Sequence, residues 1–208
     1  MNFLAHVALA SDTADAWGCS ETETQGLVAG AIIGDFVKGY IPEDWPDELR
    51  IGVALHRKVD ALSNLHPAVS RTSARFPDDL RRYAPIFLDL LADHSLARNW
   101  DQYYENDVGT YAASCYLAIE RYRDQLPERG HRFVEYMMDV DLLSQYHDWG
   151  HITDGLASVL RRLSKSPEKS IVLAACGALT EASDEMLLEL YPDLRQELSK
   201  WDRSTVGR

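Results

Sequence analysis

The pair of residues with the clearest chemical potential is His56 and Asp60, which lie four positions apart in an apolar stretch at 51–62. Residues at this spacing share one face of an α-helix, so the imidazole and the carboxylate would point the same way. Such pairs can bind a divalent metal ion, although on helix surfaces they more often only stabilise the helix. The apolar neighbours favour the metal site, because a buried histidine and aspartate need partners. A salt bridge from Arg57 to Asp60 is the simpler alternative.

A second segment carries two carboxylates and a histidine close together. Asp89 and Asp93 are again four residues apart, and His94 follows directly, about 100° further around a helix. Two carboxylates on one helical face repel each other unless a cation or a shared proton lies between them. A divalent ion would remove the repulsion, and Asp93 with His94 would offer it an oxygen and a nitrogen ligand. For Asp89, a structural salt bridge to an arginine of segment 57–82 is an equally good interpretation.

Two further polar residues lie in apolar surroundings. Asp35 is enclosed by isoleucines, a glycine and a phenylalanine, and His6 lies within an apolar stretch at 3–9. A lone histidine on an apolar face is more often a hydrogen-bonded core residue than a metal ligand, so His6 is expected to bind metal either directly or through a neighbouring ligand. The predicted ligand set of a hydrolytic metal centre is His6, Asp35, His56, Asp93 and His94. Mixed imidazole and carboxylate ligands favour Mn²⁺, with Mg²⁺, Fe²⁺ or Zn²⁺ as alternatives.

Other chemistries lack their motifs. The sequence contains no nucleophile elbow, phosphate-binding glycine loop, dinucleotide-binding fingerprint or zincin helix. Its three cysteines, Cys19, Cys115 and Cys176, are widely spaced, which indicates neither a disulfide framework nor a zinc–cysteine site. A reducing, cytoplasmic location is therefore expected. The start of the chain has no basic segment typical of a signal peptide, and no apolar run reaches the roughly 18 residues of a membrane span.

The charge of −12 is unevenly distributed. Between residues 50 and 82, seven basic residues face three acidic ones, so this segment carries +4 while each flank carries −8. The overall charge argues against general nucleic-acid binding, which requires clustered lysine and arginine. A basic centre near the metal-like motif suits an anionic substrate or partner. Solvated helix surface is the simpler alternative.

The elements that would position these residues are helices. An apolar fraction of 46% is arranged in long amphipathic runs, which predicts a single all-α domain over 1–208, with the metal motifs in 1–100 and completion of the core in 101–208. After a polar loop at 12–20, helices are expected at 21–38, 47–63, 67–75, 78–100 with a kink at Pro85, 108–125, 128–142, 144–163 and 168–202, the last with a possible break at Pro192. Gly26, Gly30 and Gly34 fall on one helical face, which indicates close helix packing.

Several short motifs occur in a fixed order in the first half of the chain. They are residues 2–6, 34–39, 55–60, 66–67, 81–84 and 88–97, followed by Trp100. In this order and spacing they resemble the acyl carrier protein phosphodiesterase family, and beyond Trp100 the resemblance rests on the weaker features at 155–156 and 161–162. Asn64 stands where the family pattern has a carboxylate, and Ala31 where it has an asparagine. These departures bear on the number of metal ions and on the substrate.

The resemblance implies a helical bundle related to the HD-type metal phosphohydrolases. It also implies hydrolysis of the phosphodiester that joins 4′-phosphopantetheine to a serine of acyl carrier protein, a protein of fatty acid biosynthesis. On this basis Arg57 and Lys38 would neutralise phosphate charge, and Asp60 or Asp89 would orient the attacking water or accept its proton. The acidic carrier protein would dock on the basic segment, at Arg71, Arg75, Arg81 and Arg82.

Two alternatives stay open from the residues alone. The same metal centre would serve a small phosphodiester or a nucleotide, whose turnover should barely depend on the docking arginines. A helical binding module for an acidic partner is the second alternative, in which the histidines and aspartates form only a buried polar network.

Overall fold

The computed structural model describes residues 1–206, and every regular element in this range is a helix. The first half contains α1 (Phe3–Ala16), α2 (Glu21–Ile33), the 3-10 turn η1 (Gly34–Phe36), α3 (Asp47–Leu65), α4 (Pro67–Ser73), η2 (Arg81–Tyr83), α5 (Ala84–Arg98) and η3 (Trp100–Gln102). The second half contains α6 (Val108–Arg121), η4 (Arg123–Gln125), α7 (Glu128–Asp139), α8 (Leu142–Gln145), α9 (Trp149–Arg162), α10 (Lys169–Ala178), α11 (Thr180–Ser199) and η5 (Arg203–Thr205). The all-α prediction is confirmed.

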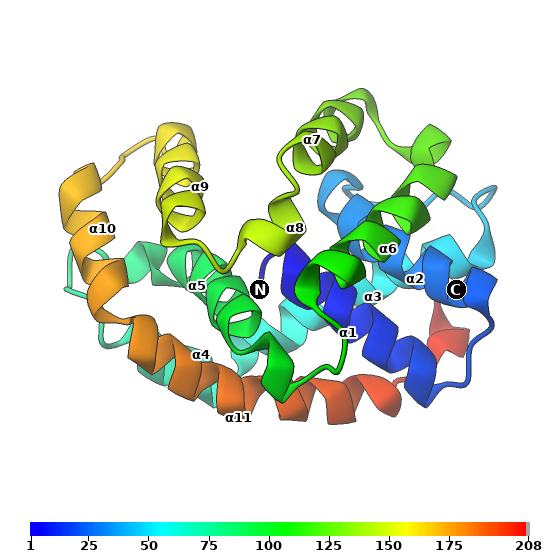
Figure 1. Cartoon of the computed structure of the whole chain (residues 1–208), viewed down its shortest axis with the longest axis horizontal. Coiled ribbons are helices and arrows are strands. Elements are labelled where there is room, and N and C mark those ends of the chain that lie inside the picture. The colour runs from blue at the N-terminus through cyan, green and yellow to red at the C-terminus, as the bar shows by residue number, and fades with distance from the viewer. Residues whose placement is uncertain (207–208) are drawn as a thin grey trace.

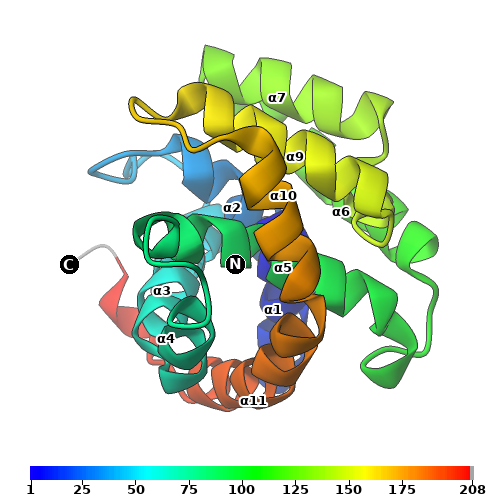
Figure 2. The same cartoon turned by 90° about the vertical axis from the view of Figure 1, so that its left-hand side faces the viewer.

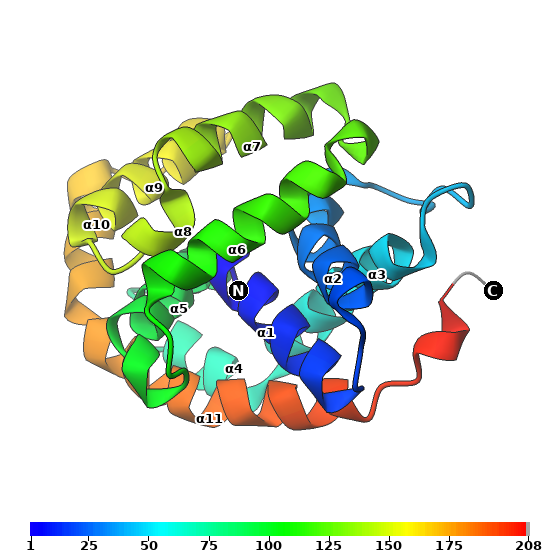
Figure 3. The ribbon, with the colours of Figure 1, turned by 45° about the vertical axis from the view of Figure 1, so that its right-hand side comes forward.

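Helix α1 occupies the centre of the molecule, and the long helix α11 runs along one edge beside α4 (Figure 1). Helices α9 and α10 rise at one end and α7 at the other, while α6 and α7 lie on the same side of α1 (Figure 3). One cluster of buried apolar side chains extends from Met1 to Leu198 and joins both halves of the chain. No helix within residues 1–206 is long and apolar enough to cross a membrane.

The closest helix pair is α2 with α3, and glycines make it possible. A Cβ atom placed on Gly30 would lie 2.6 Å from the backbone of Gly52, and one placed on Gly52 would lie 2.7 Å from the carbonyl oxygen of Gly26. Real Cβ atoms do not approach backbone so closely, so the two helices touch through their main chains. The packing interpretation of the glycine face is confirmed.

Several predicted boundaries are wrong, and tertiary contacts explain the clearest cases. Residues 12–16, expected in a loop, belong to α1, where the Asp12 carboxylate accepts hydrogen bonds from Tyr104 and Tyr191 and pairs with Arg195 at 3.1 Å. Helix α2 ends at Ile33 rather than near residue 38, and segment 168–202 is two helices that meet at Leu179. Pro192 lies inside α11, and burial of that helix against α5 outweighs the lost backbone hydrogen bond.

Candidate metal centre

Three ligand groups converge where α1 crosses α3. Nε2 of His6 lies 3.1 Å from Oδ1 of Asp60, and Nε2 of His56 lies 3.4 Å from Oδ2 of the same carboxylate. The two imidazole rings stack with centroids 4.2 Å apart and an interplanar angle of 23°. All three ligand atoms lie within 4.8 Å of one another, and within residues 1–206 this is the one cluster of three or more such groups.

Helix α2 fixes the orientation of the His56 ring. Nδ1 of His56 lies 2.8 Å from the carbonyl oxygen of Ala31, which can only accept a hydrogen bond, so Nδ1 carries the proton. Nε2 is then left with a free lone pair that faces Asp60, as required of a metal ligand. A Cβ on Gly34 would lie 2.7 Å from this ring, so the end of the glycine face holds His56 in place.

The electrostatics of the cluster favour a neutral His6 imidazole beside an ionised Asp60 carboxylate. Burial lowers the pKa of His6 to about 4, and the hydrogen bond to Asp60 only partly opposes this, so His6 is neutral at pH 7. Burial raises the pKa of Asp60, but the hydrogen bond and charge of His6, together with His56, outweigh burial and leave the pKa below its usual value. The Asp60 side chain is 45% exposed, whereas that of His6 is 3% exposed, so the cluster opens to solvent beside the carboxylate.

The spacing of these groups fits a divalent ion. Ligand atoms roughly 2.1 Å from one ion, at tetrahedral or octahedral angles, are separated by roughly 3.0–3.4 Å. The distances of 3.1 and 3.4 Å, each to a different oxygen of the Asp60 carboxylate, fall in this range, and all three ligand atoms lie within 4.8 Å of one another. Two imidazoles and one carboxylate leave coordination positions open for water or substrate, as in catalytic rather than structural sites. The donor set is compatible with a divalent metal and does not by itself select one ion.

Asp93 belongs to α5, and its side chain caps the N-terminus of α1. Its carboxylate accepts hydrogen bonds from the backbone N–H groups of Leu4 at 2.7 Å and of Asn2 and Ala5 at 3.2 Å each. These are N–H groups that a helix cannot satisfy within itself. Burial raises the pKa of Asp93 to about 7, although the N-terminal ammonium group and the three backbone donors lower it. Asp93 thus holds the turn of α1 that carries His6.

The neighbours of Asp93 also make contacts outside the cluster. Oδ1 of Asp89 lies 2.6 Å from the amino group of Met1. Nδ1 of His94 donates to the carbonyl oxygen of Tyr146 at 2.7 Å, and its ring lies against Trp149 with centroids 5.3 Å apart. The structure therefore places Asp89 beside the amino terminus and His94 against Tyr146 and Trp149, and the cluster of converging ligand atoms contains neither.

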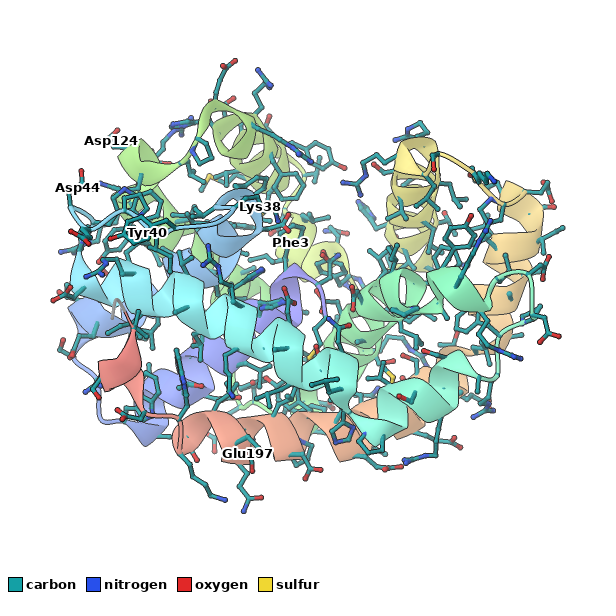
Figure 4. All side chains as sticks on the ribbon, turned by 180° about the vertical axis from the view of Figure 1, so that it is seen from behind. Phe3, Lys38, Tyr40, Asp44, Asp124 and Glu197 are labelled. Carbon is teal, nitrogen blue, oxygen red and sulfur yellow. The ribbon has the colours of Figure 1, made fainter. Side chains whose placement is uncertain are left out.

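Asp35, Lys38 and Arg57 lie at the corner where α2 ends. Asp35 is exposed in η1, directly after the glycine that contacts His56. Arg57 Nη2 donates to the carbonyl oxygen of Val37 at 3.0 Å, which ties the loop to α3 one residue away from His56. Lys38 is exposed, and Figure 4 shows it together with Phe3 above α3 in that view. This corner brings positive charge and one further carboxylate to the region of the cluster.

An aromatic wall, formed by Phe3, Phe36 and Phe133, escaped the sequence-based prediction. The ring of Phe133 on α7 lies 4.8 Å from that of Phe3 and 5.4 Å from that of Phe36. Phe3 lies one helical turn before His6, and Phe36 directly follows Asp35, so the wall joins α7 to the two segments that lead to the site. Only the family motifs at 2–6 and 34–39 signalled the first two phenylalanines, and nothing in the sequence pointed to Phe133.

The predicted docking arginines are divided between two environments. Arg71 forms an ion pair with Glu189, and Arg75 pairs with Glu185 at 3.2 Å, both on α11. Arg81 pairs with Asp78 at 2.7 Å. Arg82 instead lies over the ring of Tyr83, 4.5 Å from its centroid.

The chain is similar to a set of named bacterial proteins. The model of the acyl carrier protein phosphodiesterase family matches residues 1–194. An acyl carrier protein phosphodiesterase of Pectobacterium atrosepticum is 33% identical over 175 residues, 84% of this chain and 83% of the relative. Relatives of the same name from Escherichia coli and Yersinia pestis are 30% and 29% identical, and these matches span 96% and 95% of this chain and 98% and 97% of theirs.

No solved structure matches the chain, so its relation to the HD-type phosphohydrolases stays a prediction. The family match extends far beyond the motifs of the first half and includes α9, α10 and most of α11. This chain belongs to the acyl carrier protein phosphodiesterase family.

Proposed function

We propose that the protein hydrolyses the phosphodiester between 4′-phosphopantetheine and the serine of holo-acyl carrier protein, at the cluster of His6, His56 and Asp60. Water adds to phosphorus, the bond from phosphorus to the serine oxygen breaks, and that oxygen takes up a proton. The products are apo-acyl carrier protein and 4′-phosphopantetheine. The observation that carries the proposal is the convergence of the three ligand groups, within 4.8 Å of one another, in a chain of this family.

A bound divalent ion, with Mn²⁺ as the first to test, would lower the pKa of a water molecule and polarise the phosphoryl group. His6, His56 and Asp60 would hold it. Asp35, Asp93 and His94, the other ligands expected from the sequence, lie outside this cluster and would support the ion less directly. Asp35 follows the glycine packed against His56, Asp93 holds the start of α1, and His94 is its neighbour on α5. The exposed side of the Asp60 carboxylate is where water and substrate would enter.

The remaining groups act on the phosphate and on the water. Arg57 and Lys38 flank the Val37 carbonyl, and their positive charges would neutralise the phosphodiester. Asp60 and Asp89 are the carboxylates proposed to orient the water or accept its proton. Asn64 lies beside Met1 and Asp89 in a small cavity, where the family pattern places a carboxylate. A neutral amide at this position favours one ion rather than two.

The experiment measures metal content by elemental analysis and follows the Mn²⁺-dependent conversion of holo- to apo-acyl carrier protein by mass spectrometry. The expected result is bound metal and a mass loss equal to phosphopantetheine. His56→Ala should lose both, whereas the control His151→Ala on α9, whose side chain is 37% exposed, should retain both. Metal without that mass loss would point to a smaller phosphodiester, and a metal-free, inactive protein to a binding module.

A further inference from the structure

Five cations form a basic surface at the end of the molecule that carries α9 and α10. Arg161 and Arg162 lie in the last turn of α9, Lys165 lies in the following loop, and Lys169 begins α10. The fifth is Arg82 of η2, which is distant in sequence. All five residues are exposed, and their surface is here called the α9–α10 basic surface. Helices α9 and α10 lie toward the viewer in the upper part of Figure 2.

Specific contacts join the two segments of this surface. The hydroxyl of Tyr83 donates a hydrogen bond to the carbonyl oxygen of Lys165. The guanidinium of Arg82 donates to the same hydroxyl and covers the Tyr83 ring at 4.5 Å. The turn between α9 and α10 is therefore anchored to the segment that leads into α5, and the cations of the two segments have a fixed relation to each other.

The cations of this surface are not neutralised by neighbouring carboxylates. Among residues 1–206, none of the five forms an ion pair within 4.0 Å. Two acidic residues near these cations in the chain have other partners, because Glu168 caps α10 at the N–H groups of Ser170 and Ile171, and Asp78 pairs with Arg81. In a protein of charge −12, an unneutralised basic surface is a site of attraction for an acidic partner.

The surface also has an apolar floor. A pocket of about 430 Å³ lies between α9 and α10, and Leu160, Leu163 and Pro167 line it together with Arg161 and Lys169. Apolar area surrounded by charged and polar groups is the usual composition of a protein–protein interface. A free small anion would need only the cations, whereas a protein surface would use both the cations and the apolar floor.

We propose that the α9–α10 basic surface docks an acidic surface of the carrier protein while its modified serine is at the metal centre. This inference rests on the proposed function. Helix α5 links the two places, since it begins after Tyr83 and its Asp89 and Asp93 contact the start of α1. At 1.5 Å per residue, Asp89 lies about 9 Å along the helix from Tyr83. The Asp89 carboxylate interacts electrostatically with Asp60 of the metal centre, so α5 leads from the basic surface toward that centre.

The test compares two double variants that each remove two positive charges. Arg161→Gln/Arg162→Gln changes the proposed surface. Arg121→Gln/Arg123→Gln changes the end of α6, where the exposed Arg121 contacts Gln25 of α2 and the partly buried Arg123 pairs with Glu120 and Glu135; α6 and α9 are well separated in Figure 1. The first should raise KM for holo-acyl carrier protein about tenfold, leave kcat within about twofold and weaken the salt dependence of KM. The second should change KM less than twofold, and hydrolysis of bis(p-nitrophenyl) phosphate should be equal for both variants.

A KM within twofold of the parent for Arg161→Gln/Arg162→Gln would overturn the docking inference, and so would an equal increase in the control variant. If the parent itself fails to convert holo-acyl carrier protein, the proposed function fails. Calorimetric titration of both variants with apo-acyl carrier protein then decides the docking inference separately. Weaker binding by the α9 variant alone would support it, and equal or absent binding would overturn it.

Discussion

Helix α3 carries His56 and Asp60, and α5 carries Asp89 and Asp93, each pair four residues apart. The two pairs have different roles in the structure. In α3, His56 and Asp60 face His6 and form a cluster that opens to solvent. In α5, Asp93 is fully buried against the backbone of α1. The difference lies in what faces each helix, because α3 meets a histidine side chain and α5 meets the free N–H groups of a helix terminus. Equal spacing in a sequence therefore leaves the role of each pair undecided.

The largest expected difference between the two helices is in metal binding. His56→Ala removes one of three converging ligands and should weaken Mn²⁺ affinity at least about 100-fold, with a similar or larger loss of turnover. His94→Ala on α5 removes a contact to a backbone carbonyl and should weaken affinity less than tenfold. Calorimetric titration with Mn²⁺ measures both. Equal losses in the two variants would show that α5 belongs to the ligand set as fully as α3.

The cluster itself was partly predictable. His56 and Asp60 were found from their spacing, since one helix alone determines that they share a face. His6 was expected to be a ligand or a supporting residue, and only the crossing of α1 over α3 brings its Nε2 to Asp60. The carbonyl of Ala31 that orients His56 has no signal in any side chain. Contacts of backbone groups across helices are invisible to periodicity, and the capping role of Asp93 escaped for the same reason.

The helical class and most helices were predictable because amphipathic periodicity is local. Their ends were less so, because the ends depend on tertiary partners. The sequence around Asp12 is typical of a loop, yet Arg195 and the tyrosines Tyr104 and Tyr191 bind its carboxylate within α1. The break at Leu179 has no proline, whereas Pro192 lies inside a helix.

The second prediction tests the structural role of α5. Asp93→Ala leaves three buried N–H groups at the start of α1 without an acceptor, which should lower the free energy of unfolding by about 3 kcal/mol. Asp60→Ala, whose carboxylate is partly exposed, should lower it by less than about 1 kcal/mol in metal-free protein. Urea denaturation in the presence of a chelator measures both. The opposite order would mean that the carboxylate of α3, rather than that of α5, supports the fold.

The pH dependence of stability gives a third way to separate the two regions. The pKa of Asp93 is raised to about 7, so the folded state holds a proton that the unfolded chain loses above about pH 4. The contribution of Asp93 to stability therefore falls as pH rises from about 4 to 7. The pKa of His6 is lowered to about 4, so the unfolded chain binds the extra proton and stability rises with pH up to about 6.5. These two contributions oppose each other in the parent.

Asp93→Asn removes the contribution of Asp93 to the pH dependence of stability and keeps that of His6. Relative to the parent, the free energy of unfolding of this variant should therefore rise with pH by roughly 3–4 kcal/mol between about pH 4 and 7. The measurement is a series of urea denaturation curves of both proteins in chelator. A constant difference between the two proteins across this range would mean that Asp93 is ionised throughout it, and that its three backbone donors outweigh burial.

The smallest expected effect concerns Arg71 on α4 and Arg75 just after it, which pair with glutamates of α11. Arg71→Gln/Arg75→Gln breaks two exposed ion pairs with Glu189 and Glu185, which should change the free energy of unfolding by less than about 1 kcal/mol, because solvent screens such pairs. The variant leaves two glutamates unpaired on α11, so KM for holo-acyl carrier protein should rise only about two- to threefold, less than for Arg161→Gln/Arg162→Gln. The KM ratio of the two variants at low and physiological salt measures this. A larger rise for Arg71→Gln/Arg75→Gln would place the docking surface on the basic segment 71–82, as expected from the sequence and its family resemblance.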